Sequence, residues 1–185
     1  MFNGDKQTIE SGSHNIQAGG DVNISTNYYS GYCPAKIVFY ENDICDVINE
    51  FDQYTELFAG DPIDNTENTE FDFIFKSEKN ELNNLSEEYF EIICDSFLEY
   101  FEKIKHFLGL PQNKEILKKY RKSALQLKIH IGVIRKRFEY FEDALNHVTY
   151  EIVNNTSREK IKSNPDLIIL FVNFMYWNCD IGRKA

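Results

Sequence analysis

The stretch LKKYRKSALQLKIHIGVIRKRFEYFEDALNHVTYEI, from Leu117 to Ile152, decides the expected fold. Its apolar positions recur at spacings of three and four, and they are Leu117, Tyr120, Ala124, Leu127, Ile131, Ile134, Phe138, Phe141, Leu145, Val148 and Ile152. An apolar repeat of this period, kept over about five heptads, specifies the seam of a left-handed coiled coil. The pattern therefore predicts one continuous helix of about 40 residues, which is roughly 60 Å long at 1.5 Å per residue.

The segment before this helix carries its own start and stop signals. Ser86 is a good N-cap with Glu87 and Glu88 in the first turn, and Gly109 with Pro111 ends the helix. Its apolar stripe consists of Phe90, Ile93, Phe97, Phe101, Ile104 and Leu108. Because the turn between the two helices is short, we expect them to fold back as an antiparallel hairpin.

Two further helices complete the expected bundle. Helical spacing begins near Asp43 and stops before Gly60 and Pro62, with one apolar face formed by Ile44, Val47, Ile48, Phe51 and Tyr54. A last helix begins at Pro165, a residue suited to a first turn, and should cover part of the far seam from Phe138 to Ile152. A buried core is favoured there over the alternative, an uncovered seam that would bind a partner.

The front of the chain contains an internal repeat. Residues 11–18 align without gaps on residues 19–26, so that Ile16 matches Ile24. A glycine turn followed by a polar and then an inward apolar residue is typical of a β-solenoid rung, and so few rungs cannot stand alone. We therefore expect copies from several chains to associate through Ile16, Val22 and Ile24, although a flexible tail is the alternative.

These patterns together predict a mainly α fold in two parts. We expect residues 1–30 to form the β-solenoid-like repeat, an oligomerisation element, and residues 31–185 to form a helical interaction domain. One or two short strands, over residues 36–40 and 71–75, precede a bundle with a long heptad-patterned hairpin.

Charge and cysteine content exclude some classes of function. A formal charge of −10 and a pI near 4.9 argue against direct nucleic-acid binding, so the basic runs 114–121 and 135–137 are interpreted as solvated helix faces. The scattered cysteines (Cys33, Cys45, Cys94 and Cys179) favour reduced thiols and a cytoplasmic location. The longest apolar run, residues 167–177, is too short to span a membrane.

No motif in the sequence indicates catalysis. The histidines fall singly, and we find no metal-ligand spacing, no phosphate-binding loop and hence no cofactor site. Asparagines cluster beside predicted helix starts, where their amides more often hold turns than catalyse reactions; they are Asn80, Asn83, Asn84 and Asn113. Cys179 is interpreted as a small hydrophobe and Gly182 as part of a helix C-terminal turn.

Several short motifs, taken in order, resemble a known family. They are Phe71 to Phe75, Lys79-Asn80, Asn83-Asn84-Leu85, Tyr89-Phe90, Phe107-Leu108, Pro111-Gln112-Asn113, Phe138 to Leu145 and Met175 to Gly182. This region, about residues 65–185, resembles the C-terminal-domain proteins of bacterial three-component systems built around an ABC/SMC-type ATPase. The resemblance implies a role in defence against phage or plasmids, beside the ATPase and a small middle component.

In that family the helical region is expected to dock on the complex, and the segment before it to carry an effector. Here the front segment is only the Gly/Asn repeat, so we expect a non-enzymatic adaptor. The expected partner-binding residues are Lys79, Asn80, Asn83, Asn84, Asn113, Cys179, Asp180 and Gly182. The alternatives are a small helical nuclease or toxin whose site assembles in the oligomer, and an antitoxin-like inhibitor.

Overall fold

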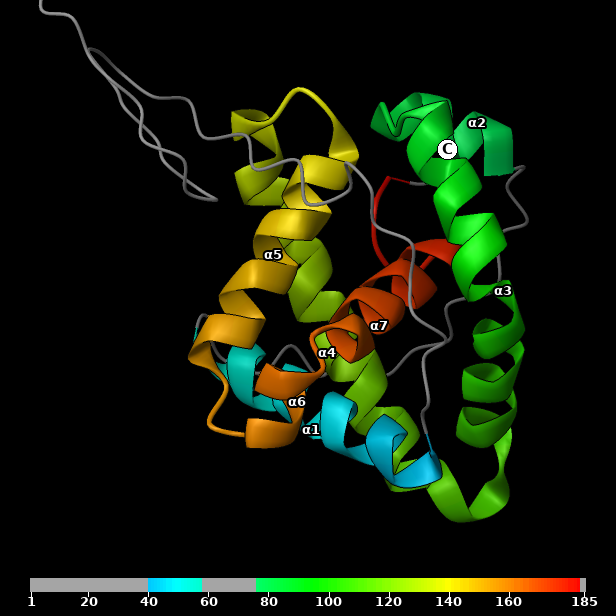
Figure 1. The fold of residues 1–185 in the computed structure, drawn as a ribbon, viewed down its shortest axis with the longest axis vertical. Coiled ribbons are helices and arrows are strands. Elements are labelled where there is room, and N and C mark those ends of the chain that lie inside the picture. The colour runs from blue at the N-terminus through cyan, green and yellow to red at the C-terminus, as the bar shows by residue number, and fades with distance from the viewer. Residues whose placement is uncertain (1–39, 58–75, 184–185) are drawn as a thin grey trace, which may run out of the picture. The chain divides into compact units, whose positions relative to one another are not determined.

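The computed structural model describes residues 40–57 and 76–183, which form seven α-helices and two 3-10 turns (Figure 1). The elements are α1 (Glu41–Glu56), α2 (Lys76–Asn83), α3 (Glu87–Gly109), η1 (Pro111–Asn113), α4 (Lys114–Ile134), η2 (Arg135–Arg137), α5 (Phe141–Asn155), α6 (Glu159–Ser163) and α7 (Asp166–Trp177). The mainly α prediction is confirmed. The N-terminal repeat and the strand expected over residues 71–75 lie outside the described residues, as does all but Tyr40 of the other strand.

The prediction of one long helix from Leu117 to Ile152 is wrong. The chain leaves α4 after Ile134, passes through η2 and starts α5 at Phe141. The apolar spacing continues because both helices face one core, and spacing alone cannot distinguish a straight helix from a bend that keeps the phase. The bend itself is held by polar contacts with Asn83, the last residue of α2, and with Asn84, which follows it.

Helix pairing also differs from the expected antiparallel hairpin. The main neighbour of α4 is α1, whereas α3 and α4 diverge from η1 with α7 lying between them (Figure 1). The ring of Phe174 on α7 lies 5.7 Å from that of Phe101 on α3 and 5.8 Å from that of Tyr120 on α4. Phe174 of α7 thus packs between α3 and α4 and separates the two helices.

Helix α7 forms the centre of the core. It is apolar around its whole circumference, as expected of a fully buried helix, and its buried apolar residues are Leu167, Ile168, Leu170, Phe171, Val172, Phe174, Met175 and Tyr176. Its one buried amide, Asn173, accepts a hydrogen bond from the Tyr89 hydroxyl at 3.0 Å and donates to the Ile169 carbonyl at 2.8 Å. Among the described helices, none is both long and apolar enough to cross a membrane.

The far half of the heptad seam is covered within the chain. Helix α5 packs against α7, and its seam residues Phe141, Leu145, Val148 and Ile152 are all at most 2% exposed. The prediction of a buried core is confirmed there, and the alternative of an exposed partner strip on these positions is wrong.

The helix ends follow the sequence signals in most cases. The Ser86 hydroxyl accepts the Tyr89 N–H at 3.3 Å and so caps α3, which ends at Gly109 as expected. Asn113 stands at the N-cap position of α4, but its amide donates to the Phe107 carbonyl at 2.8 Å instead of capping α4. The Asn113 side chain therefore stabilises the end of α3 and not the start of α4.

Candidate interaction site

Helix α2 holds the C-terminal end of the chain through two lysines one turn apart. The ammonium of Lys76 donates to the Trp177 carbonyl and lies 4.3 Å from the indole centroid. The ammonium of Lys79 donates to the Tyr176 carbonyl and lies 3.8 Å from the centroid of that residue's ring. Both accepting carbonyls belong to the last turn of α7, which carries the negative end of the helix dipole.

Burial gives these lysines an unusual environment. Lys79 is 0% exposed, and Lys76 is half-buried. Burial lowers the pKa of Lys76, because removing water disfavours the charged ammonium. The carbonyl and ring contacts offset part of this desolvation, since a cation over a desolvated aromatic ring is attracted to its face. The two side chains therefore stabilise the junction of α2 and α7.

Asparagines of α2 complete this junction. The Asn83 amide donates to the Arg183 carbonyl at 3.2 Å, and its oxygen accepts the Arg183 N–H at 2.7 Å. The Asn80 side-chain oxygen accepts the Tyr176 hydroxyl at 3.0 Å. We call this arrangement the α2 clamp: Lys76, Lys79, Asn80 and Asn83 of α2, with residues 176–183.

A glycine allows the chain to pass closely under α2. Gly182 has φ +83°, and a Cβ there would lie 3.1 Å from Tyr176 Cε2 and 3.2 Å from Asn83 Oδ1. Both the backbone conformation and the space therefore require glycine. Just before it, the Asp180 carboxylate accepts the Tyr120 hydroxyl and, at 2.8 Å, the Asn178 amide. Burial, together with the Asp180 charge, raises the pKa of Tyr120.

The other side of the asparagine segment organises the bend between α4 and α5. Asn84 has φ +54°, its amide donates to the Glu139 carbonyl at 2.8 Å, and its own carbonyl accepts the Phe141 N–H at 3.0 Å. The Arg135 guanidinium bridges the carbonyls of Asn83 and Glu139 at 3.2 and 2.9 Å. These contacts satisfy backbone groups that a break between helices would otherwise leave unpaired.

Seven of the eight expected partner-binding residues thus fall into three environments. Lys79 and Asn83 are buried inside the clamp; Asn80, Cys179, Asp180 and Gly182 are partly exposed at its edge; Asn84 is exposed. Asn113, in η1, follows the C-terminal end of α3, whereas α2 precedes the N-terminal end of that helix. The segment from Lys76 to Asn83, whose asparagines were expected to hold a turn, is helical, and within it and the next residue only Asn84 has the left-handed conformation of a turn. The self-association residues Ile16, Val22 and Ile24 lie outside the described residues.

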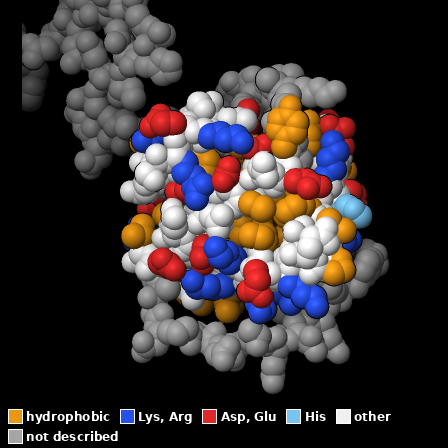
Figure 2. Space-filling model, turned by 90° about the horizontal axis from the view of Figure 1, so that it is seen from below, with side chains coloured by type: hydrophobic (Ala, Val, Ile, Leu, Met, Phe, Trp, Pro, Cys, Tyr) orange, Lys and Arg blue, Asp and Glu red, His pale blue; other side chains and the backbone are white. Residues whose placement is uncertain are grey.

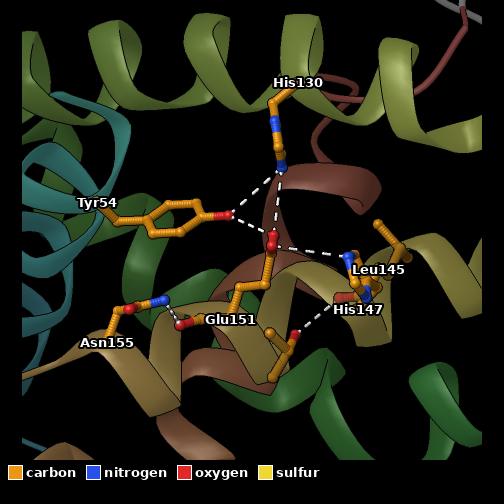
Figure 3. Close-up of polar contacts among 7 residues, drawn as sticks. Tyr54, His130, Leu145, His147, Glu151 and Asn155 are labelled. Atoms are coloured by element: carbon orange, nitrogen blue, oxygen red, sulfur yellow. Dashed lines mark hydrogen bonds and ion pairs between the residues drawn. The ribbon is translucent and has the colours of Figure 1, made fainter. Parts of the chain in front are cut away.

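A second polar cluster, shown in Figure 3, joins α1, α4 and α5. The Tyr54 hydroxyl donates to Glu151 Oε2 at 2.7 Å. His130 Nε2 lies 3.3 Å from the same oxygen, and His147 Nε2 lies 3.7 Å from Oε1. Burial would raise the pKa of Glu151, but the hydrogen bonds from Tyr54 and His130 and the nearby imidazoles outweigh it and lower the pKa.

This cluster was missed from the sequence because its members are far apart along the chain. Single histidines gave no signal, and Glu151 had no distinguishing neighbours. Three helices meet at one carboxylate, so its clearest role is to fix their packing. Within the described ranges, no group of three or more His, Cys, Asp or Glu side chains is placed to hold a metal ion.

A small cavity opens beside this cluster. Its volume is about 150 Å³, and it is lined by Glu50, Gln53, Tyr54, Leu57, Ile152, Asn155 and Ser157. The volume is below the several hundred Å³ of most small-molecule sites. One lining carboxylate, that of Glu50, lies 3.0 Å from Arg158 Nε and is paired with it. The cavity therefore offers little recognition chemistry of its own.

The face formed by α1 and α6 carries ion pairs between neighbouring helices. Lys122 Nζ lies 2.8 Å from Asp52, and Arg158 lies 2.9 Å from Asp46. Lys160 is paired with Asp43, whose carboxylate raises the pKa of this ammonium. Figure 2, which views this side of the molecule, shows Lys and Arg side chains interleaved with Asp and Glu. The face is thus electrically mixed and largely self-neutralised.

Comparison with known proteins gives one family. Neither the curated proteins nor the solved structures contain a significant match to this chain. A family model, however, matches residues 34–182, which include every described helix. The matched range covers most of the chain and includes all of the α2 clamp except Arg183. The chain therefore belongs to the family described as C-terminal domain 12 of the ABC-three component (ABC-3C) systems.

Proposed function

We propose that this chain is a non-enzymatic docking subunit of a cytoplasmic ABC-3C defence complex, held beside the ATPase and a small middle component. The observation that carries the proposal is the family match over residues 34–182, because the family is a domain of a multi-component system. Its helical body would bind the ATPase partner, and its N-terminal repeat would join copies of the chain through Ile16, Val22 and Ile24.

The edge of the α2 clamp is the proposed docking surface. Rigid surfaces bind with a smaller loss of conformational entropy than mobile ones. The buried side chains of Lys79 and Asn83 fix α2 against the end of α7. Beside them, Leu82 is 40% exposed and Asn84 and Asp180 offer polar groups at the rim. An exposed apolar side chain with a polar rim is the usual anatomy of a protein interface.

The test is a tagged pull-down from the native host, with co-purifying proteins identified by mass spectrometry. We expect an ABC-type ATPase in near-stoichiometric amount. Leu82→Asp should lower its recovery at least about tenfold, because a charge at an interface centre is costly. Leu57→Asp is the matched control: Leu57 is 72% exposed at the end of α1, away from the α2 clamp, and the change should leave recovery unchanged.

Two results would contradict the proposal. One is recovery of the chain without any ATPase, and the other is equal loss of the ATPase in both variants. For the repeat, replacing Ile16 and Ile24 together by Asp should lower the oligomeric mass in sedimentation without changing helical circular dichroism. An unchanged oligomeric mass would show that the repeat does not mediate self-association.

A further inference from the structure

The solvent faces of α3 and α4 carry opposite charge. On α3, exposed carboxylates recur at spacings of three and four, and they are Glu88, Glu91, Asp95, Glu99 and Glu102. On α4, exposed cations recur at compatible spacings, and they are Lys114, Lys118, Arg121 and Lys128. Residues spaced in this way share one side of a helix. We call the two sets the acidic row and the basic row.

The charges of both rows remain largely unpaired by the rest of the fold. Within the described residues, no member of the acidic row takes part in an ion pair. In the basic row, Lys118 lies 2.9 Å from Glu115, but their side chains are 69% and 80% exposed. An ion pair exposed to that degree is weak and easily exchanged for another.

The rows also match in length and in their apolar content. From Glu88 to Glu102 and from Lys114 to Lys128, each spans about 21 Å at 1.5 Å per residue. Leu98 lies within the acidic row and is 36% exposed. Ile129 and Val133, beside the end of the basic row, are 47% and 64% exposed. Each face therefore carries charges mainly of one sign, with exposed aliphatic side chains in or beside the row.

We propose that the acidic row of α3 docks against the basic row of α4 in a second copy of this chain. The complementary charge, the equal length and the exposed aliphatic side chains all favour this occupant, and every copy carries both faces. Nucleic acid is a poorer match to the basic row, because the chain has a formal charge of −10 and aliphatic rather than aromatic side chains beside the row.

This contact goes beyond the proposed docking function and does not depend on it. It also differs in physical character from the apolar association proposed for the N-terminal repeat. Opposed exposed charges are screened by salt, whereas apolar association is not weakened by it. We expect self-association through the rows to weaken at least about tenfold between roughly 0.05 M and 0.5 M salt.

The test uses the full chain with Ile16 and Ile24 replaced by Asp, so that the repeat does not contribute. Sedimentation is measured for this background, for an α3 variant (Glu91→Lys with Glu102→Lys), for an α4 variant (Arg121→Glu with Lys128→Glu), and for the chain carrying all four changes. All four side chains are exposed, so the fold should tolerate the changes, which circular dichroism checks. Glu78→Lys with Glu81→Lys, on exposed positions of α2, is the matched charge control.

We expect salt-sensitive self-association of the background and of the α2 control, its loss in the α3 and α4 variants, and its return when all four changes are combined. The combined chain has the net charge of the background, so its recovery would exclude a general charge effect. A background chain that is monomeric at every concentration would overturn the proposal. So would association that persists in either single-row variant, or a folded combined chain that stays monomeric. A monomer that binds nucleic acid through the basic row would also overturn it.

Discussion

Lys79 of α2 and Lys122 of α4 occupy opposite environments. Lys79 is fully buried and donates to a helix carbonyl over a tyrosine ring, whereas the side chain of Lys122 is 46% exposed and pairs with Asp52. A buried cation must be held by its surroundings, or the cost of desolvation unfolds that region. An exposed cation keeps its water and can change partners. The buried lysine therefore contributes strongly to the stability of the fold, whereas the exposed lysine can be replaced at little cost.

Removing the buried lysine should have the largest effect. Lys79→Ala should lower the free energy of unfolding by about 3 kcal/mol, because it leaves the Tyr176 carbonyl and the ring face without their partner. Urea denaturation followed by circular dichroism measures the change. Lys79→Met keeps most of the side-chain volume and should cost less. If Lys79→Ala is as stable as wild type, the clamp does not hold the fold.

Adding a side chain at Gly182 should lower the free energy of unfolding somewhat less than Lys79→Ala does. Gly182→Ala should destabilise by about 2 kcal/mol, because it strains a left-handed backbone and brings a methyl group close to Tyr176 and Asn83. The control is Gly132→Ala in α4, where nothing lies within 4 Å and alanine favours the helix by about 0.5–1 kcal/mol. Thermal melts of the two variants should shift in opposite directions. Equal shifts would contradict the proposed close approach.

The Glu151 side chain is 34% exposed, between the fully buried Lys79 and the 46% exposed Lys122, so its replacement should have an intermediate effect. Glu151→Gln should destabilise by at most about 1 kcal/mol at neutral pH, since solvent screens part of the interaction. The folded pKa of Glu151 is lowered, so the stability from its charged form is present above the ordinary value of 4.5 and is lost as pH falls through the folded value. The difference between wild type and variant should therefore shrink below pH 4.5. A difference that grows on acidification would contradict this assignment.

Removing the exposed ion pair between Lys122 and Asp52 should have the smallest effect on the free energy of unfolding. Lys122→Ala should change the free energy of unfolding by less than about 0.5 kcal/mol, as is usual for exposed ion pairs. Chemical denaturation at low and high salt measures it, and salt should remove what difference there is. A loss of stability as large as that of Lys79→Ala would show that buried and exposed cations contribute equally to the fold.

Sequence patterns predicted the local features well. Ser86 as a cap, the end of α3 at Gly109 and the buried apolar stripes all follow from spacing and helix-end chemistry, which act over a few residues. The break after Ile134 was not predictable in this way. It is held by Asn84 and Arg135, and contacts between segments more than 50 positions apart leave no periodic signal.

The candidate site was only partly predictable for the same reason. The asparagine segment and the C-terminal end were both identified from their residues, but nothing in their spacing indicated that Asn83 would bind the backbone of Arg183. The pairing of Lys79 with the end of α7 was equally hidden, because a lysine on a short polar helix normally stays in water.

We propose that the edge of the α2 clamp docks on an ABC-3C partner. Hydrogen–deuterium exchange of the chain alone and in the complex purified from its host measures whether this surface is covered. We expect slower exchange on binding at α2 and residues 178–183, with little change on the face of α1 and α6. Unchanged exchange at α2, with protection confined to another face, would contradict it.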